Sequence, residues 1–342
     1  CFPHGTDFSA SEVSCVCLEG WNGESCSVPQ VVWDSYGFQT WYREGYIRRR
    51  RRPRTIINSF VFNHELDLLE IRVNELGDAV DYFLACEANF TYFGDPKPIH
   101  LRSNISAGFL SRHRRKIVTL EIETYFVSDG DPWAPENYIR SSIWQKGRHL
   151  FQNLSDDDLF MISDADEIPS REVMLFLKYH DGFGEPIALT LRSFLYGFFW
   201  TSDTPVSVGG VCTVAYLRDV YSYDSNLVRR KWFRWMNATT NSTGTVWTPW
   251  TISGTYPAYA GWHCSWCFDA VGIQVKLASA NRDDGVRWGD FAEKRDVGYI
   301  NSLRKTGRYF DDSGPLTKVD GYEVAPSYLR QDVQRWSYLL YI

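Results

Sequence analysis

Three carboxylates fall within four residues of the sequence, Asp164, Asp166 and Glu167, in the stretch LFMISDADEIP (159–169). The apolar run LFMI before them predicts a buried strand, so the carboxylates follow the end of that strand. Two interpretations fit this pattern. One is an acidic, solvated turn. The other is a divalent-cation site, because two carboxylates separated by one residue on irregular backbone can face the same ion.

Hydrolysis is the competing enzymatic chemistry. Glycosidases also use paired carboxylates, but these groups lie at least about 5 Å apart and usually come from different strands. The sequence contains neither a G-x-S-x-G nucleophile elbow nor an H-E-x-x-H zinc helix. Adjacent carboxylates followed by Glu-Ile-Pro therefore suit a cation better than a hydrolytic pair.

The elements that must position these carboxylates begin at residue 55. Strand patterns at 55–63, 81–89, 114–122 and 158–164 are separated by helical patterns that include 64–77 and 137–154. This alternation predicts βαβ units and a mostly parallel sheet covered by helices. Ligands bind such sheets outside the carboxyl ends of the strands, which is where Asp164 and Asp166 fall. The cation interpretation is therefore favoured.

The second half of the chain is less regular. PIALTLRSFLYGFFW (186–200) and GIQVKLAS (272–279) carry strand patterns, and residues 288–307 predict a helix that closes at Gly307. The C-x-x-C at 264–267 lacks the second pair that a zinc site requires. Structural disulfides or buried thiols are therefore favoured over a redox or zinc role, and the pairing of this second group of cysteines stays open: Cys86, Cys212, Cys264 and Cys267.

Bulk composition limits the functional classes. The net charge of −6 argues against a nucleic-acid partner, which would favour a basic face. The 14 Trp, 20 Tyr and 21 Phe exceed what is usual and suit stacking on sugar rings as well as core packing. The sequence holds no apolar run of about 18 residues and no signal peptide. Because it begins at a cysteine within a module, we expect it to be a soluble portion of a longer protein.

Two features predict the secretory pathway. N-x-Ser/Thr sequons occur at five positions, and four of the eight cysteines fall in the first 26 residues. Dense cysteines in a short segment indicate disulfides, which require an oxidising compartment. The sequons are at Asn89, Asn104, Asn153, Asn237 and Asn241.

The N-terminal segment, residues 1–29, contains CVCLEGWNGESC (15–26), which resembles the C-terminal half of an EGF-like module. This resemblance implies the disulfides Cys1–Cys15 and Cys17–Cys26 and a structural role. A zinc knuckle is the competing interpretation. Residues 30–54 are predicted to be a basic linker, because the run RRRRRPR (48–54) is typical of a solvated, flexible segment. A nucleic-acid arm or a processing site is the alternative for that run.

Several segments together resemble glycosyltransferase family 17: CVCLEGWNG, NHELDLLEIRVNELGD, CEANFTYFGDPKP, SDADEIPSREVMLFL, YAGWHCSWCF and RWGDFAEKRD. The resemblance implies a GT-A-like catalytic domain over residues 55–342, an α/β, Rossmann-related mixed sheet covered by helices. It also implies inverting, β1,4-linked transfer of N-acetylglucosamine from UDP-GlcNAc to the core β-mannose of an N-glycan. Enzymes of the family are Mn²⁺-dependent type II membrane proteins of the Golgi, and their anchor would precede residue 1.

The resemblance also implies roles for particular residues. Asp164 and Asp166 match the Asp-x-Asp that binds the metal and the diphosphate, with Glu167 in support. His263 is a candidate further metal ligand, and a core histidine is the alternative. Donor-binding candidates near the strand ends and on the preceding helix are Phe62, Asn63, His64, Glu65, Glu87, Asn89, Arg140 and Gln145. For Arg140, a helix-surface position is the alternative.

An inverting transfer needs a general base for the acceptor hydroxyl. The candidates are Asp224, Asp284, Asp290 and Glu293, of which Asp290 is favoured because RWGDF places it between aromatic residues near a helix start. Acceptor stacking is predicted for some of Trp247, Trp250, Trp262 and Trp266, with core packing as the alternative. A secreted, glycan-binding adhesion protein without turnover is the rival hypothesis from a different functional class.

Overall fold

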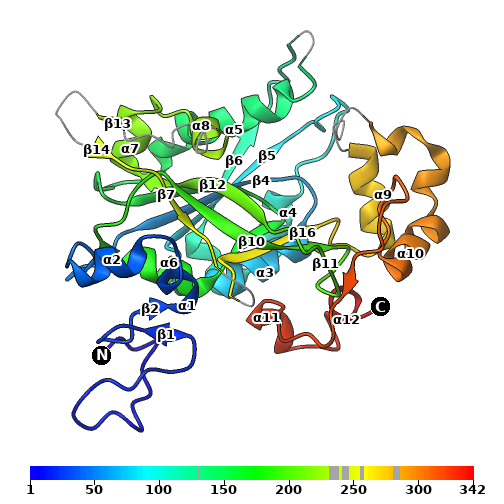
Figure 1. Cartoon of the computed structure of the whole chain (residues 1–342). Coiled ribbons are helices and arrows are strands. Elements are labelled where there is room, and N and C mark those ends of the chain that lie inside the picture. The colour runs from blue at the N-terminus through cyan, green and yellow to red at the C-terminus, as the bar shows by residue number, and fades with distance from the viewer. Residues whose placement is uncertain (129–130, 231–238, 241–245, 255–257, 280–285) are drawn as a thin grey trace.

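The computed structural model describes residues 1–128, 131–230, 239–240, 246–254, 258–279 and 286–342. One large mixed sheet forms its centre (Figure 1), in the strand order β17 (Thr317–Lys318), β11 (Trp200–Thr201), β10 (Ile187–Leu195), β12 (Val206–Thr213), β7 (Leu159–Asp164), β4 (Ile56–Phe62), β5 (Tyr82–Ala88) and β6 (Ile117–Ile122). The strands β7, β4, β5 and β6 are parallel, and β12 runs antiparallel to β7 and β10. The predicted α/β class with a mixed sheet and helices is confirmed.

The parallel half contains a reversal of strand order. The chain runs outward from β4 through β5 to β6, and then returns through α5 (Ala134–Gly147) to place β7 on the other side of β4. Val61 is therefore paired with Asp164 where these two strands end. A reversal of this kind opens a crevice at the carboxyl ends of the strands, which positions the acidic turn for ligand binding.

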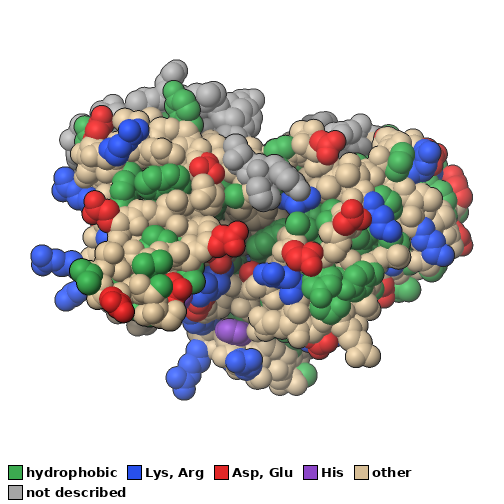
Figure 2. Space-filling model, turned by 60° about the horizontal axis from the view of Figure 1, so that its bottom comes forward, with side chains coloured by type: hydrophobic (Ala, Val, Ile, Leu, Met, Phe, Trp, Pro, Cys, Tyr) green, Lys and Arg blue, Asp and Glu red, His purple; other side chains and the backbone are tan. Residues whose placement is uncertain are grey.

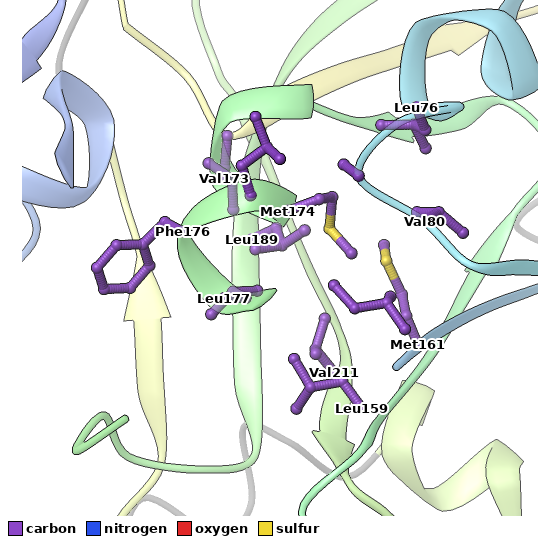
Figure 3. Close-up of a cluster of buried hydrophobic side chains, with 14 of the residues drawn as sticks. Leu76, Val80, Leu159, Met161, Val173, Met174, Phe176, Leu177, Leu189 and Val211 are labelled. Carbon is purple, nitrogen blue, oxygen red and sulfur yellow. The ribbon is translucent and has the colours of Figure 1, made fainter. Parts of the chain in front are cut away.

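Helices cover both faces of the parallel strands. On one face, α3 (Leu66–Leu76) and α6 (Arg171–Tyr179) share a core with the sheet, and on the other face α5, α7 (Val214–Asp219) and α8 (Ser225–Arg230) do so. The Ser170 side chain caps α6 by accepting from the Val173 amide at 3.2 Å. Figure 3 shows Met174 and Leu177 of α6 among sheet side chains such as Leu189. Burial of each such side chain contributes about 1.5–3 kcal/mol, so α6 firmly anchors the turn that precedes it.

A second, smaller core lies towards the C-terminus and contacts the acidic turn from the opposite side. Its strands are β16 (Gly261–Ser265), parallel to β10, and β8 (Glu167–Pro169), antiparallel to β16. β15 (Trp250–Ile252) also pairs with β10, but its Trp250 and Ile252 belong to the first core. The helical segments of this part are α9 (Ala270–Ser279), η4 (Trp288–Asp290), η5 (Ala292–Arg295), α10 (Val297–Thr306), α11 (Ser327–Arg330) and α12 (Ser337–Leu340).

Two local predictions in this part need correction. GIQVKLAS is helical rather than extended, because Ile273 and Leu277 form a buried i, i+4 stripe while Val275 is exposed. The helix predicted over 288–307 is divided into η4, η5 and α10, because Asp296 is extended and its carboxylate caps a new helix at the Tyr299 amide. The predicted stop at Gly307 is confirmed, since its φ of 68° is left-handed.

The N-terminal segment carries both disulfides implied by its resemblance, Cys1–Cys15 and Cys17–Cys26. A short ladder of β1 (Trp21–Asn22) and β2 (Val28–Pro29) joins it to α1 (Gln30–Trp33). A third disulfide closes Cys264–Cys267, whereas Cys86 and Cys212 are buried thiols. The structural interpretation of the second cysteine group is thereby confirmed. The remaining short elements are α4 (Leu101–Ser106), η1 (Ser111–Lys116), η2 (Arg148–Leu150), β13 (Thr239–Thr240) and β14 (Val246–Trp247).

The arginine run is partly ordered against the domain. After α2 (Phe38–Arg43), β3 (Arg48–Arg49) pairs with β9 (His180–Asp181), while Arg51 and Arg52 are exposed. Arg50 and Arg54 both pair with Asp181, and Arg54 is buried. The prediction of a flexible, solvated run is therefore wrong for these two arginines, because tertiary carboxylate partners fix them. None of the helices described here combines the length and apolar character needed to cross a bilayer.

Candidate active site

The acidic turn connects β7 to β8 at the reversal of strand order. Arg72, which is fully buried on α3, holds its backbone by donating to the carbonyls of Asp164 and Glu167. The same guanidinium donates to Asn58 and Ser163, at 2.9 Å each. Burial lowers the pKa of Arg72 to about 10, so it remains charged at neutral pH. Arg72 thereby fixes the path of the turn from beneath.

Asp164 is held by two arginines from the helices on one face of the sheet. Its Oδ1 lies 2.6 Å from Arg140 Nη2, and its Oδ2 lies 3.1 Å from Arg229 Nη2. Burial alone would raise the pKa of Asp164, but the charges of Arg140 and Arg229 outweigh it and hold this pKa well below its usual range. Arg140 therefore points into the site, and the helix-surface alternative for this residue is wrong.

Asp166 is paired with a lysine from the other side of the turn. Its Oδ2 lies 3.1 Å from Lys276 Nζ on α9. Burial opposes ionisation of both groups, yet their mutual attraction lowers the pKa of Asp166 and raises that of Lys276. The Asp166 carbonyl accepts the Cys264 amide at 2.8 Å, so the loop closed by Cys264–Cys267 is joined to the turn. Asp166 is thus a fixed, ionised carboxylate next to a cation.

Glu167 and His263 face each other across the β8–β16 pair. Glu167 accepts the Asp164 amide at 2.9 Å and pairs with Arg229 at 2.5 Å. His263 Nε2 contacts Ser265 Oγ at 2.7 Å, and its Nδ1 lies 3.6 Å from Glu167 Oε1. Although burial lowers the pKa of His263, its acidic neighbours Glu167 and Asp166 raise it overall. The Nδ1 atom is buried without a hydrogen bond in the described residues, so this histidine has an unused ligand atom.

A narrow pocket opens at the carboxyl ends of β4 and β5. Phe62 and Asn63 line it, together with Phe90, Tyr92 and Lys97 from the segment that follows β5. The Asn63 side chain also donates to Ser279 at the end of α9, at 3.0 Å. Two of the predicted donor-site residues therefore line a pocket beside the acidic turn.

Other predicted donor residues take structural positions around this pocket. Glu65 accepts the amides of Asn63 and His64, while His64 stacks on Phe268 with ring centres 4.8 Å apart. Burial lowers the pKa of His64, which favours its neutral form. The Glu87 carboxylate is occupied by Lys97 and by the amides of His100 and Leu101.

Gln145 lies apart from the acidic turn. It is exposed on α5, five residues beyond Arg140. At 1.5 Å per residue this is about 7 Å further along the helix, which leads away from the carboxyl edge of the sheet. Its backbone carbonyl accepts a hydrogen bond from Arg148 at 2.9 Å.

The candidate bases do not enter the cluster of charges around the turn. Asp224 accepts the Asn226 amide at 3.0 Å and so caps α8. Asp290 is paired with Arg287 and is 57% exposed, and Glu293 is exposed on η5. Arg287 nevertheless lies 3.9 Å from the Phe93 ring, which places the segment around Asp290 against the loop after β5. Asp284 lies outside the described residues.

The tryptophans divide between core and surface. Trp250 and Trp266 are buried in the two cores, so core packing is confirmed for them. Trp262 is half-buried, and its indole N–H donates to the Val324 carbonyl at 2.6 Å. The side chain of Trp247 lies outside the described residues.

Apart from Arg140, sequence reasoning did not identify the basic side chains of the site. Arg72, Arg229 and Lys276 lie 92, 65 and 110 residues from the acidic residues they contact. For Arg72 a local signal exists, because it is a charged residue within the apolar stripe of α3. Arg229 and Lys276 have no comparable signal, since a basic residue near a helix end is usually solvated.

Sequence comparison places the chain among the glycosyltransferases. The sequence model of glycosyltransferase family 17 matches residues 38–211, and the chain belongs to this family.

Among its relatives is the Homo sapiens protein named beta-1,4-mannosyl-glycoprotein 4-beta-N-acetylglucosaminyltransferase, which is 42% identical over 336 residues. The proteins of that name from Rattus norvegicus and Mus musculus are each 41% identical over 336 residues. The alignments cover 96% of this chain but 62% of the human and 61% of each rodent protein, so the chain spans about three fifths of these relatives.

Proposed function

We propose that the chain catalyses inverting transfer of N-acetylglucosamine from UDP-GlcNAc, in β1,4 linkage, to the core β-mannose of N-glycans. The observation that carries this proposal is the position of the Asp164–Glu167 turn at the reversal of strand order, surrounded by Arg140, Arg229 and Lys276. Membership of family 17 and the name of its relatives support the choice of sugar and acceptor.

In this proposal the donor lies along the carboxyl ends of β4, β5 and β7. The uracil and ribose lie beside Phe62, Asn63 and Tyr92 in this proposal. The pocket there is partly aromatic but encloses only about 10 Å³, so these side chains would have to move apart to admit them. The diphosphate lies nearer the turn, where Arg229 and Lys276 offer positive charge. Fixed cations at this position stabilise the charge that develops on the leaving UDP.

A Mn²⁺ ion is part of the proposal. The chemistry of the available donors fits it, because carboxylate oxygens and imidazole nitrogen suit Mn²⁺ and the buried Nδ1 of His263 is unused. Asp164, Asp166 and His263 would hold the ion, and Arg229 would leave Asp164 to make room. Among the described residues, no three His, Cys, Asp or Glu side chains are already arranged to hold a metal. When bound, the ion would offset negative charge on the diphosphate.

Asp290 is our proposed general base. Its segment packs on the loop after β5 through the contact of Arg287 with Phe93, and the neighbouring residues of that loop, Thr91 and Tyr92, line the donor pocket. In the Arg287–Asp290 ion pair the Arg287 side chain is only 9% exposed, but the Asp290 side chain is 57% exposed, so its carboxylate can turn towards solvent. Asp224 is less suited because its carboxylate caps a helix, and Glu293 lies on the exposed η5 segment.

The secretory pathway is the proposed location, as the Golgi lumen of a type II membrane protein. Three disulfides, two of them in the first 26 residues, support an oxidising compartment.

A glycan-binding protein without turnover is the second candidate function. The ion pairs that occupy both oxygens of Asp164 favour it, because they compensate the acidic turn without a metal.

The test is incubation of the chain with UDP-GlcNAc, MnCl₂ and a biantennary N-glycan, with UDP release and product mass as readouts. We expect one added N-acetylhexosamine on the core mannose, loss of turnover in excess EDTA, and recovery with added Mn²⁺. Glycan binding without UDP release would support the second candidate. Full turnover in EDTA would exclude the metal from the proposal, and transfer from a different sugar nucleotide would exclude the donor.

A further inference from the structure

A second hollow lies on the underside of the molecule as drawn in Figure 1, and Figure 2 shows this face with a depression between two masses. It is formed where three separate parts of the chain meet. Gly20 and Gln30 come from the N-terminal segment and α1, Ser170 and Trp262 from the β8–β16 region, and Glu323 from the segment before α11. The hollow encloses about 380 Å³, which is within the range of small-ligand sites.

The lining combines aromatic and polar side chains. Trp262 is paired with Arg192 across the parallel strands β16 and β10, so their side chains lie on the same face of the sheet. The indole of Trp262 is fixed by its 2.6 Å bond to the Val324 carbonyl, and Tyr259 adds a second aromatic residue. An aromatic surface with a few polar groups at its margin suits a ligand that has both C–H faces and hydroxyls.

Two carboxylates restrict the ligand further. Glu172 lies in the first turn of α6 with 41% of its side chain exposed, and its distance of 3.9 Å from Arg171 is too long for a hydrogen bond. The surrounding protein raises the pKa of Glu172, as expected for a carboxyl on the wall of a depression. Glu323 lines the same hollow. Two acidic groups disfavour a phosphate or another anion, and they can accept hydrogen bonds from the hydroxyls of a neutral sugar.

One strand pair connects a wall of the hollow to the acidic turn. In the β8–β16 ladder, His263 is paired with Glu167, Trp262 with Ile168, and Gly261 with Pro169. Ser170, which lines the hollow, lies three residues beyond Glu167, which corresponds to about 10 Å of extended chain. Because successive side chains of a strand face opposite sides, Trp262 and His263 lie on opposite faces of this ladder. A glycan that reaches both must therefore pass round the buried β8 strand, which requires an oligosaccharide of several sugar units.

We infer that this hollow binds one of the branches carried by the core β-mannose of the acceptor glycan, a neutral oligosaccharide, while that mannose lies at the acidic turn. The inference rests on the proposed function, because it requires a branched acceptor. It assigns a substrate-binding role to Gln30 and Gly20, and hence to the N-terminal disulfide segment. The contact would make recognition depend on the shape of the whole glycan rather than on the reacting sugar alone.

The test compares a complete biantennary glycan with a core oligosaccharide that lacks the second branch. The variants are Tyr259→Ala and Glu172→Gln, with Tyr36→Ala as the control because Tyr36 is 90% exposed outside the hollow. For each variant, kcat/KM is measured with both acceptors, and the donor KM is measured with the complete acceptor. We expect the preference for the complete acceptor to fall about tenfold through its KM, equivalent to about 1.4 kcal/mol.

Binding of the complete glycan in the absence of donor, measured by calorimetric titration, separates this inference from the proposed function. If the chain transfers no sugar yet binds the glycan more weakly after Tyr259→Ala, the proposed function fails and the hollow remains a glycan site. If transfer occurs but both acceptors respond equally to the variants, or neither responds, the inference is overturned. Unchanged thermal unfolding of both variants is required for either reading.

Discussion

The amino ends of the parallel strands form one edge of the sheet, the amino edge, and their carboxyl ends form the opposite, carboxyl edge. Both edges carry similar charged groups, but these groups bind different partners. At the amino edge, Asp158 accepts the amides of Thr55 and Ser155, both at 2.7 Å, and Asp81 accepts the Ile56 amide at 2.8 Å. At the carboxyl edge, Asp164 and Asp166 are paired with side chains from distant helices. Carboxylates bonded to backbone amides join strand starts and cannot be released without disturbing the sheet. Carboxylates bonded to long basic side chains can exchange partners, which a binding site requires.

Two histidines show the same contrast. At the amino edge, His180 has both ring nitrogens occupied, by the Phe176 carbonyl at 3.0 Å and by Ser27 at 2.9 Å. Burial lowers its pKa to about 4, so it is neutral and structural. At the carboxyl edge, His263 has an unused Nδ1 and a pKa raised by its acidic neighbours despite burial. Of these two histidines, the one with both ring nitrogens occupied is structural, and the one with an unpartnered Nδ1 lies at the candidate site.

The largest expected effect is on catalysis, when the same Asp→Asn substitution is made at each of the two edges. Asp166→Asn should reduce kcat/KM for UDP-GlcNAc by about a thousandfold, or about 4 kcal/mol, because it removes a charged ligand of the proposed Mn²⁺ that offsets the diphosphate charge. Asp157→Asn, at the amino edge, should leave kcat/KM unchanged. Steady-state kinetics of both variants with UDP release as readout provides the measurement. Equal activity of the two variants would remove the distinction between the edges.

Replacement of a buried arginine at each edge should affect stability equally and activity unequally. Arg72→Met leaves the carbonyls of Asp164 and Glu167 unpaired and should reduce the free energy of unfolding by about 3 kcal/mol. Arg54→Met should cause a similar loss, because Arg54 donates to the carbonyls of Leu177 and His180. Urea unfolding measures both.

Activity per folded molecule then distinguishes the two arginine variants. It should fall in Arg72→Met, where the acidic turn loses its support, and stay constant in Arg54→Met. A loss of equal size in both variants would mean that global stability, and not the position of the turn, controls turnover.

The fold was predictable where a local pattern determines it. Alternating apolar strands and amphipathic helices in 55–164 identify the βαβ half, and the position of Asp164 at a strand end follows directly. GIQVKLAS was misjudged because Ile273, Val275 and Leu277 alternate like a strand, while burial of Ile273 and Leu277 alone decides for a helix. That decision depends on what α9 packs against, which is tertiary information.

Only part of the candidate site could be predicted, because a local pattern reveals its acidic residues but not most of its basic ones. Its acidic residues are adjacent in the sequence, so their types and spacing reveal them. Its basic residues, Arg72, Arg229 and Lys276, reach the turn from three separate helices, and their pairing depends on how these helices pack. Arg50 and Arg54 were misassigned to a flexible run because their carboxylate partner, Asp181, lies more than 120 residues away.

An acid-dependent loss of stability is expected from His180. Its pKa is about 4 in the folded chain and about 6.5 when unfolded, so the unfolded chain binds a proton first as the pH falls. The stabilisation is complete above pH 6.5 and is lost as the pH falls towards 4. Between pH 7.5 and 5 the loss should be about 2 kcal/mol, measured by urea unfolding at each pH. His180→Gln should remove this component of the pH dependence, and an unchanged profile in that variant would assign it elsewhere.

The smallest effect concerns two arginines of equal exposure. Arg50 and Arg229 are each 18% exposed, and each bridges two carboxylates. The partners of Arg50 are 48% and 45% exposed, so Arg50→Gln should cost only about 0.5 kcal/mol and less in 0.5 M NaCl. Arg229→Gln should cost more, about 2 kcal/mol, because Glu167 is 1% exposed and would lose a charged partner. Urea unfolding of both variants at low and high salt tests the difference. If Arg50→Gln proves the more costly of the two, burial of the carboxylate partners does not govern the strength of these ion pairs.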